Sequence, residues 1–312
     1  LELNESAFRN CKCALRVKNN IFSKSMIFFI TKTQFLESVN PRQHEHAYVS
    51  FLFEDTIQKA GDFNSSFISI RLSGTLFKHC GSYNDAGAFS ILYHNRGTNT
   101  VRPGDIYITC LILSSSFINN TSIHAGGAIE ISNIHYVKLK QSYFINNRAS
   151  NGGAVYVSNI TIFSALNITM IANFADAIGG PGGGAIFSED ILLFMVYNVT
   201  LLNNRAVEEG GALLTARVTF IKLHFINVMQ NSVWRGRVIK GRRKGRGIGG
   251  GISITNCLYI FISNADITNN KIDEDGIGTG GGVCIIHFAI ILYISLTQWL
   301  LVTLLGYFLV VQ

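Results

Sequence analysis

A seventeen-residue step recurs along this chain of 312 residues and limits its fold more than any other feature. A Gly is followed seventeen positions later by an apolar residue that opens a four-residue tetrad ending in Asn. The pairs are Gly127 and Phe144, Gly153 and Met170, Gly184 and Leu201, Gly211 and Val228, and, one residue shorter, Gly251 and Ile267. A repeat of this size indicates stacked structural units, which form long surfaces more often than single deep pockets.

The stretch from each tetrad to the next Gly is where the length varies. It takes ten residues from Phe117 to Gly127, fourteen from Met170 to Gly184 and twenty-three from Val228 to Gly251. We therefore expect the Gly-to-tetrad stretch to be a fixed wall and the tetrad-to-Gly stretch to be a surface loop, because loop-closure entropy grows only slowly with length.

The wall has the residue pattern of β-strands. Ala128–Ile131, Ala154–Val157 and Tyr136–Lys140 alternate with period two and are rich in branched and aromatic residues. A unit of 26 residues, the step from Phe144 to Met170, that holds two or three short strands fits one coil of a parallel β-helix. In such a coil, Gly supplies a positive φ or a close backbone approach. The tetrad Asn residues are expected to stack into a ladder of side-chain amide hydrogen bonds.

The pattern continues in weaker form towards the N-terminus. Phe77–Cys80, Phe35–Ser38 and Phe8–Cys11 resemble degenerate tetrads, which gives nine or ten tetrads in all. The sequence begins in mid-pattern and without Met, so we expect a piece of a longer protein. We divide the chain into degenerate coils (1–76), regular coils (77–283) that carry a basic insertion (235–247), and a hydrophobic tail (284–312).

Two motifs alternate along the regular coils. The best copies are Phe117–Asn120 with Gly126–Ile129, and Phe144–Asn147 with Gly152–Val155. Over residues 77–283 this alternation resembles the repeats of the chlamydial polymorphic outer membrane proteins. The resemblance implies a right-handed, single-stranded parallel β-helix of the pectin-lyase-like type, displayed at a cell surface with adhesive or structural roles. It implies no catalytic residues.

The net charge of +7 comes from the basic insertion. Without its seven basic residues, 19 basic residues balance 19 acidic ones. These seven residues are predicted either to bind a polyanion or to form a solvated excursion. They are Arg235, Arg237, Lys240, Arg242, Arg243, Lys244 and Arg246. No aromatic residue follows Trp234 in the insertion, so we expect no specific nucleic-acid partner.

Cysteines and Asn-x-Ser/Thr sequons bear on the compartment. The six cysteines (11, 13, 80, 110, 257 and 284) form no C-x-x-C pair, and isolated cysteines in a β-helix usually fill the core. Seven sequons are candidate N-glycosylation sites, which would fit passage through a secretory pathway. They begin at Asn4, Asn64, Asn119, Asn120, Asn159, Asn167 and Asn198. The alternative is that the repeat itself favours Asn, Ser and Thr.

The C-terminal tail is strongly apolar. From Val283 to Val311 the sequence contains no Asp, Glu, Lys or Arg, and Phe288–Val311 is long enough to span a bilayer as a helix. We therefore predict a transmembrane helix and membrane contact through residues 284–311. The alternative is one more coil, because Val283–Ile286 resembles Ile252–Thr255.

Candidate catalytic residues are sparse. The positions expected to be equivalent to Glu130 in later coils are Tyr156, Ser188, Leu214 and Thr255, so no column of carboxylates is predicted. The acidic run 273–275 lacks the spacing of a calcium loop, and His44 and His46 lack a third ligand. We expect no cofactor.

The sequence thus predicts a non-enzymatic cell-surface protein. Its wall and loops would recognise an extracellular protein or glycan through many weak contacts. The alternative is a polysaccharide-binding or polysaccharide-degrading protein on the same fold, which three or more carboxylates converging in a cleft would favour.

Overall fold

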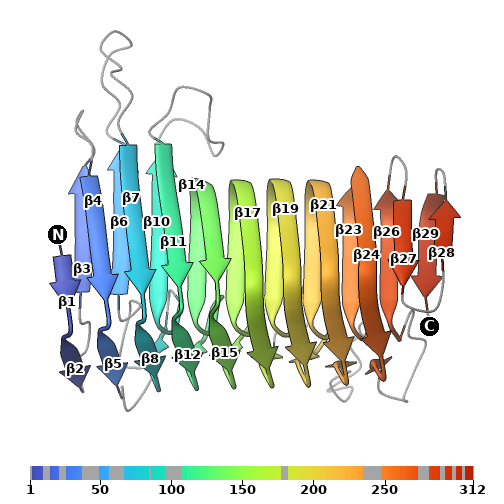
Figure 1. Ribbon diagram of the computed structural model, residues 1–312, viewed down its shortest axis with the longest axis horizontal. Coiled ribbons are helices and arrows are strands. Elements are labelled where there is room, and N and C mark those ends of the chain that lie inside the picture. The colour runs from blue at the N-terminus through green and yellow to red at the C-terminus, as the bar shows by residue number, and fades with distance from the viewer. Residues whose placement is uncertain are drawn as a thin grey trace, which may run out of the picture.

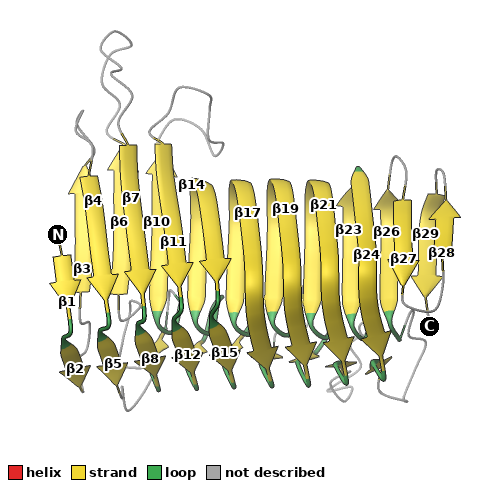
Figure 2. Ribbon diagram, viewed as in Figure 1, coloured by secondary structure: helices red, strands yellow, loops and turns green. Residues whose placement is uncertain are grey.

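The computed structural model describes residues 2–9, 15–20, 26–36, 49–55, 67–83, 86–95, 107–176, 182–234, 247–272, 281–288, 292–296, 300–303 and 306–311. Within these ranges every regular element is a β-strand, and the strands stack side by side from β1 near the N-terminus to β28 and β29 near the C-terminus (Figures 1 and 2). Strands β1 to β27 pair in parallel with their neighbours in the stack. The predicted all-β solenoid of parallel strands is confirmed.

Each coil contributes to three faces of one large sheet. The first face contains β3 (Leu15–Asn20), β6 (Val49–Asp55), β10 (Phe89–Asn95), the first parts of β14 (Ile129–Lys140), β17 (Val155–Ile171), β19 (Ile186–Leu202) and β21 (Leu213–Met229), then β23 (Ile252–Cys257) and β26 (Val283–Phe288). The second face contains β1 (Glu2–Asn4), β4 (Met26–Thr31), β7 (Phe67–Ser73), β11 (Tyr107–Leu113), the continuations of β14, β17, β19 and β21, then β24 (Tyr259–Thr268) and β27 (Leu292–Leu296).

The third face is shorter. It contains β2 (Ala7–Arg9), β5 (Gln34–Leu36), β8 (Leu76–Lys78), β12 (Ser116–Ile118), β15 (Tyr143–Ile145) and the last parts of β17, β19, β21 and β24. A separate ladder of two-residue strands completes the coil. Its members are β9 (Gly81–Ser82), β13 (Thr121–Ser122), β16 (Arg148–Ala149), β18 (Phe174–Ala175), β20 (Arg205–Ala206), β22 (Ser232–Val233) and β25 (Lys271–Ile272).

The residues that open the tetrads form one continuous column on the third face, buried from Phe35 to Val228 and partly buried at its two ends. Each pairs in register with its equivalent one coil away, from Phe8 through Phe35, Phe77, Phe117, Phe144, Met170, Leu201 and Val228 to Ile267. The rings of Phe117 and Phe144 stack with centroids 4.8 Å apart and planes 2° apart. Nine of the predicted tetrads, including the degenerate ones, therefore belong to a single stack.

The two glycines of each pair have different tasks. The first lies in the left-handed region, as Gly152 does with φ of 59°. The second meets the next coil so closely that a Cβ on Gly153 would lie 2.2 Å from the carbonyl oxygen of Gly184. A Cβ on Gly211 would meet the carbonyl oxygen of Gly250 in the same way. Gly250, not Gly251, therefore fills this position, and the seventeen-residue step to Ile267 is kept.

The other corners of the coil each turn on one residue with positive φ. Between the first and second faces these residues are Asn133, Asn159, Asp190, Arg217 and Asn256. Between the second and third faces they are Glu5, Lys32, Gly74, Ser114, Gln141, Asn167, Asn198, Phe225 and Asn264. After the third face they are His79, Asn119, Asn146, Ala172, Asn203, Gln230 and Asn269. Asn is frequent at these corners because it tolerates this conformation better than other non-Gly residues.

The predicted asparagine ladder is present. Side-chain amide hydrogen bonds of 2.9–3.1 Å link Asn120, Asn147, Asn173, Asn204, Asn231 and Asn270 in succession. The Oδ1 atom of Asn204 also accepts a 3.0 Å bond from the backbone N–H of Asn173, and its Nδ2 donates to the carbonyl of Met170. Cys80, which replaces Asn in its tetrad, donates its backbone N–H to Asn120. The ladder thus satisfies buried backbone groups of one coil with side chains of the next.

Insertions occur at two corners rather than at one. Residues 56–66 separate β6 from β7, and residues 96–106 separate β10 from β11. In later coils a single residue such as Asn133 makes this corner. The expectation that all length variation falls between tetrad and Gly was therefore wrong for the N-terminal coils.

The predicted transmembrane helix over residues 284–311 is not what the structure shows. Strand β26 continues the first face, with Ile252 opposite Val283 and Thr255 opposite Ile286, and β27 continues the second. Strands β28 (Leu300–Thr303) and β29 (Gly306–Val311) then pair antiparallel with β27 and β26. The alternative of a further coil is confirmed for its first two faces, because β26 and β27 extend the ladders of β23 and β24. No described strand of this coil lies on the third face, because the chain instead doubles back in β28 and β29. No described helix could span a membrane.

Candidate functional site

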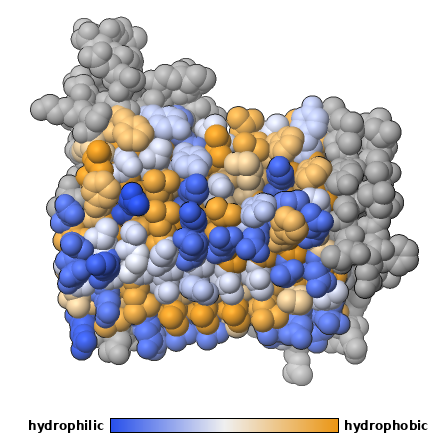
Figure 3. Space-filling model, in the orientation of Figure 1, coloured by the Kyte–Doolittle hydropathy of each residue, from blue (hydrophilic) through white to orange (hydrophobic). Residues whose placement is uncertain are grey.

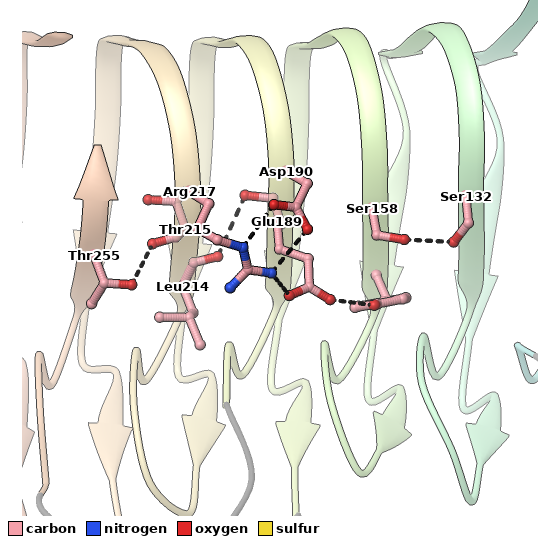
Figure 4. A network of polar contacts seen from close by, with 10 residues as sticks. Ser132, Ser158, Glu189, Asp190, Leu214, Thr215, Arg217 and Thr255 are labelled. Atoms are coloured by element: carbon pink, nitrogen blue, oxygen red, sulfur yellow. Dashed lines mark hydrogen bonds and ion pairs between the residues drawn. The ribbon is translucent and has the colours of Figure 1, made fainter. Parts of the chain in front are cut away.

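The first candidate is a polar cluster where the first face meets its corner (Figure 4). The Tyr156 hydroxyl donates a 2.5 Å hydrogen bond to Glu189 Oε1. Arg217 binds Glu189 through Nη2 at 2.5 Å and Asp190 through Nε at 2.7 Å. Glu130 lies beside Tyr156 in the preceding coil. The cluster therefore brings together three carboxylates, one phenol and one guanidinium from four successive coils.

The charged side chains Glu189 and Asp190 of this cluster are held in ion pairs with Arg217. Burial raises the pKa of Tyr156, and its hydrogen bond to Glu189 raises it further, so the phenol stays protonated. The hydrogen bond from Arg217 to Asp190 is the main cause of the raised pKa of that guanidinium. Figure 4 shows the Glu189 and Asp190 side chains both directed towards Arg217. Among the described residues, no group of His, Cys, Asp and Glu could hold a metal ion.

The expected equivalents of Glu130 need correction. In register, Glu130 is followed by Tyr156, Phe187, Leu214 and Ser253, rather than by Ser188 and Thr255. Each true equivalent stands three residues after the second Gly of its pair, as Glu130 does after Gly127 and Phe187 after Gly184, whereas Ser188 and Thr255 stand further along their strands. The corrected column contains one carboxylate, so the expected absence of an acidic column at this position holds for these coils.

The second candidate is the outward surface of the second face, onto which Figure 3 looks. We name its C-terminal part the aromatic–lysine platform, formed by Tyr197, Phe220, Lys222, His224, Phe225 and Tyr259. Its four large rings expose 39–45% of their surface. Neighbouring rings touch, with centroids 5.2 Å apart for Tyr197 and His224 and 6.1 Å apart for Phe220 and Tyr259.

The second face carries almost no negative charge. Residues 26–31, 67–73, 107–113, 134–140, 160–166, 191–197, 218–224 and 259–263 include no Asp or Glu. They include Arg71, Lys138, Lys140 and Lys222, and none of these four makes an ion pair with another described residue. Figure 3 shows hydrophilic patches set among hydrophobic ones on the face turned towards the viewer. The sequence analysis missed this surface, because its signal appears only when every second residue of successive strands is aligned.

An aliphatic stripe runs along the third face. It consists of the second residues of five successive tetrads, each half-buried: Ile118, Ile145, Ile171, Leu202 and Met229. The stripe adds a second continuous apolar surface but holds no charged or chemically reactive group.

Most predicted glycosylation sites coincide with structural positions of asparagine. Asn119, Asn159, Asn167 and Asn198 all have positive φ at corners. Asn120 is fully buried, and its Nδ2 donates to Phe77 and Asn147, so a glycan there is incompatible with the ladder. Asn4 is exposed and accepts a hydrogen bond from Thr31. The repeat thus places Asn at five of the seven sequons for structural reasons, while glycosylation of the exposed Asn residues stays a prediction and Asn64 lies outside the described residues.

Several other predicted features also lie outside the described residues. They are the basic residues Arg235 to Arg246, the acidic run 273–275, His44, His46, Cys11 and Cys13. The remaining cysteines, Cys80, Cys110, Cys257 and Cys284, are buried free thiols, as expected for core-filling residues. Burial raises the pKa of Cys257 and of Cys284 to about 11. These thiols are therefore unreactive in the folded chain.

Comparison with known proteins supports the repeat type. Residues 141–158 match the family model described as the Chlamydia polymorphic membrane protein repeat. The matched segment contains the tetrad Phe144–Asn147 and the pair Gly152 and Gly153, so the expected resemblance is confirmed. A search of curated proteins gave no match.

One solved structure is similar at low score. The crystal structure of the periplasmic alginate epimerase AlgG aligns with 93% of this chain and 78% of its own, at 10% identity and a TM-score of 0.28. A likeness at this score carries no argument about substrate or activity.

Proposed function

We propose that this chain, with its repeat of the Chlamydia polymorphic membrane protein type, is a cell-surface β-helix that recognises an extracellular partner without catalysing a reaction. The proposal includes the right-handed winding of pectin-lyase-like solenoids. The observation that carries it is the unbroken register of nine tetrads from Phe8 to Ile267. A stack of equal coils presents a long flat surface, which suits recognition through many weak contacts.

The charge distribution supports recognition rather than chemistry. Glu189 and Asp190 of the polar cluster are bound to Arg217, and the second face offers exposed rings and lysines over several coils. Exposed apolar residues that gather on one surface are typical of an interaction site.

Surface labelling tests the location. Intact cells that produce the full chain are treated with a membrane-impermeant, amine-reactive biotin reagent, and the protein is recovered on streptavidin. We expect labelling in intact cells equal to that in lysed cells, while a cytosolic control protein is labelled only after lysis. Labelling of this chain only after lysis would overturn the proposed location.

A polysaccharide-degrading enzyme is the second candidate, and the polar cluster is the observation that favours it. A protonated Tyr156 between Glu130 and Glu189 has the composition of a general acid with a neighbouring base. The test is release of new reducing ends or unsaturated products from acidic polysaccharides, compared between the unmodified chain and Tyr156→Phe. Release that is lost in Tyr156→Phe would favour the enzyme, and no release by either protein would favour recognition.

A further inference from the structure

We infer that the aromatic–lysine platform binds a linear acidic polysaccharide laid along the axis of the solenoid. This inference rests on the proposed surface function, which makes extracellular glycans the accessible polyanions. It goes further by assigning the ligand class and the residues that contact it.

Three of the four cations of the second face lie in one row. Arg71, Lys138 and Lys222 occupy the same outward column, because Arg71 pairs with Leu111 and Leu111 with Lys138, while Ser164 and Met195 connect Lys138 to Lys222. With strands about 4.8 Å apart, the row spaces its charges at roughly 10 Å and roughly 14 Å along the axis. Such a row fits an extended polymer that carries repeated anionic groups better than a single small anion.

Within the part of the chain that the structure describes, the cations of this face have no acidic partner. No Asp or Glu occurs on the second face from β4 to β24, and the cluster carboxylates Glu189 and Asp190 are bound to Arg217 at the corner. Lys222 instead lies over the ring of Phe261, with Nζ 5.8 Å from the ring centroid. A lysine without a carboxylate partner, held against an aromatic ring as Lys222 is, is available to an external anion.

The exposed rings supply an apolar contact to the ligand that the cations of this face do not provide. Tyr197, Phe220, Phe225 and Tyr259 are each 39–45% exposed on a surface built from flat strands. Tyr197 and Phe225 meet edge to face with centroids 5.6 Å apart, so ring faces and ring edges are both presented outward. Aromatic rings offer apolar contact to the C–H faces of sugar rings, and the neighbouring hydroxyl and imidazole groups offer hydrogen bonds to sugar hydroxyls.

The fold itself suggests a platform variant that keeps its structure. Phe225 occupies a corner with φ of 51°, where other coils place Asn198 and Asn264, so Phe225→Asn removes a ring without straining the backbone. Combined with Lys222→Gln, it removes one ring and one charge from the platform. The matched control is Lys78→Gln with Tyr143→Thr, which removes one charge and one ring from the third face, where Thr169 is the equivalent of Tyr143.

Binding of the purified full chain is measured by biolayer interferometry against immobilised polygalacturonate, heparin, neutral dextran and single-stranded DNA. We expect binding to at least one of the two acidic polysaccharides, with no binding to dextran. The platform variant should weaken this binding about tenfold or more, which corresponds to about 1.4 kcal/mol, whereas the control should stay within about twofold. Binding should weaken as salt is raised.

Three results would overturn the inference: no binding to either acidic polysaccharide, equal weakening by platform and control variants, or tighter binding to single-stranded DNA than to both glycans. Because this experiment uses purified protein, its outcome is independent of the surface-labelling result. Failure of the platform and failure of the proposed location are thus distinguishable.

Discussion

Replacing one rung of the asparagine ladder tests whether the stack depends on side-chain amides. Asn204→Ala removes the Oδ1 that accepts from the backbone N–H of Asn173 at 3.0 Å and from its Nδ2 at 2.9 Å. Both donors belong to a fully buried residue, and water cannot replace the lost acceptor. Each orphaned donor costs about 1–3 kcal/mol, so the variant should lose roughly 2–6 kcal/mol of unfolding free energy.

The neighbouring residue provides a matched control. Asn203 lies at an exposed corner with φ of 54°, and Ala172 occupies the same corner one coil earlier. Asn203→Ala is thus the same chemical change outside the ladder, and it should cost only about 1 kcal/mol, from the positive φ.

The assay combines urea unfolding with hydrogen exchange. Unfolding followed by circular dichroism gives the overall loss, and exchange followed by mass spectrometry should show faster exchange of the Asn173 amide in Asn204→Ala but not in Asn203→Ala. The local measurement matters because repeat arrays can unfold in parts. If Asn204→Ala costs no more than Asn203→Ala, the ladder does not stabilise the stack and our reasoning fails.

Three further predictions concern glycine, cysteine and the insertion. Gly153→Val should lose more than about 3 kcal/mol of unfolding free energy, because the new side chain meets the backbone of the next coil. Gly74→Asn should be tolerated, because Asn198 occupies the equivalent corner. Thermal melts of both variants check this, and similar melting temperatures would contradict it. Burial raises the pKa of Cys257 from 9.0 to about 11 on folding. The buried neutral thiol therefore contributes its whole stabilisation below pH 9, and this stabilisation is lost as the pH rises towards 11. The urea midpoint of unfolding should therefore fall more between pH 8 and pH 11 in the unmodified chain than in Cys257→Ala. An equal fall in both proteins would contradict this prediction. Deleting residues 237–246 should leave the melting temperature nearly unchanged, because β22 and β23 each keep their partners on both sides; a large drop would place the insertion in the core.

The repeat was predictable because its signals are local and recur. Phe117 and Phe144 open tetrads that end in Asn, and each buried rung requires both an apolar residue and an amide. The run Gly249–Gly251 misled the assignment of the last regular coil, since three successive glycines leave the register undetermined until the strand partners of Ile252 are known.

The tail and the platform were harder to predict for physical reasons. An apolar run such as Val283–Val311 is compatible with a membrane-spanning helix and with successive buried strands. Only the pairing of β26 and β27 with β23 and β24 shows that strands form here. The platform depends on which residues align across coils, and the insertions at 56–66 and 96–106 hide that alignment in the N-terminal part. Corner residues such as Asn167 have a structural reason for being Asn, their positive φ, which the sequence alone did not reveal.

The asparagine ladder has a direction, and this has a consequence for synthesis on the ribosome. In every rung the acceptor oxygen comes from the coil that is made later, as when Asn231 receives the backbone N–H of Asn204. A chain that folds as it emerges, N-terminal part first, therefore always carries one unfinished rung at its growing edge. Each newly made coil completes its predecessor, and translational pausing between coils would prolong exposure of that open edge.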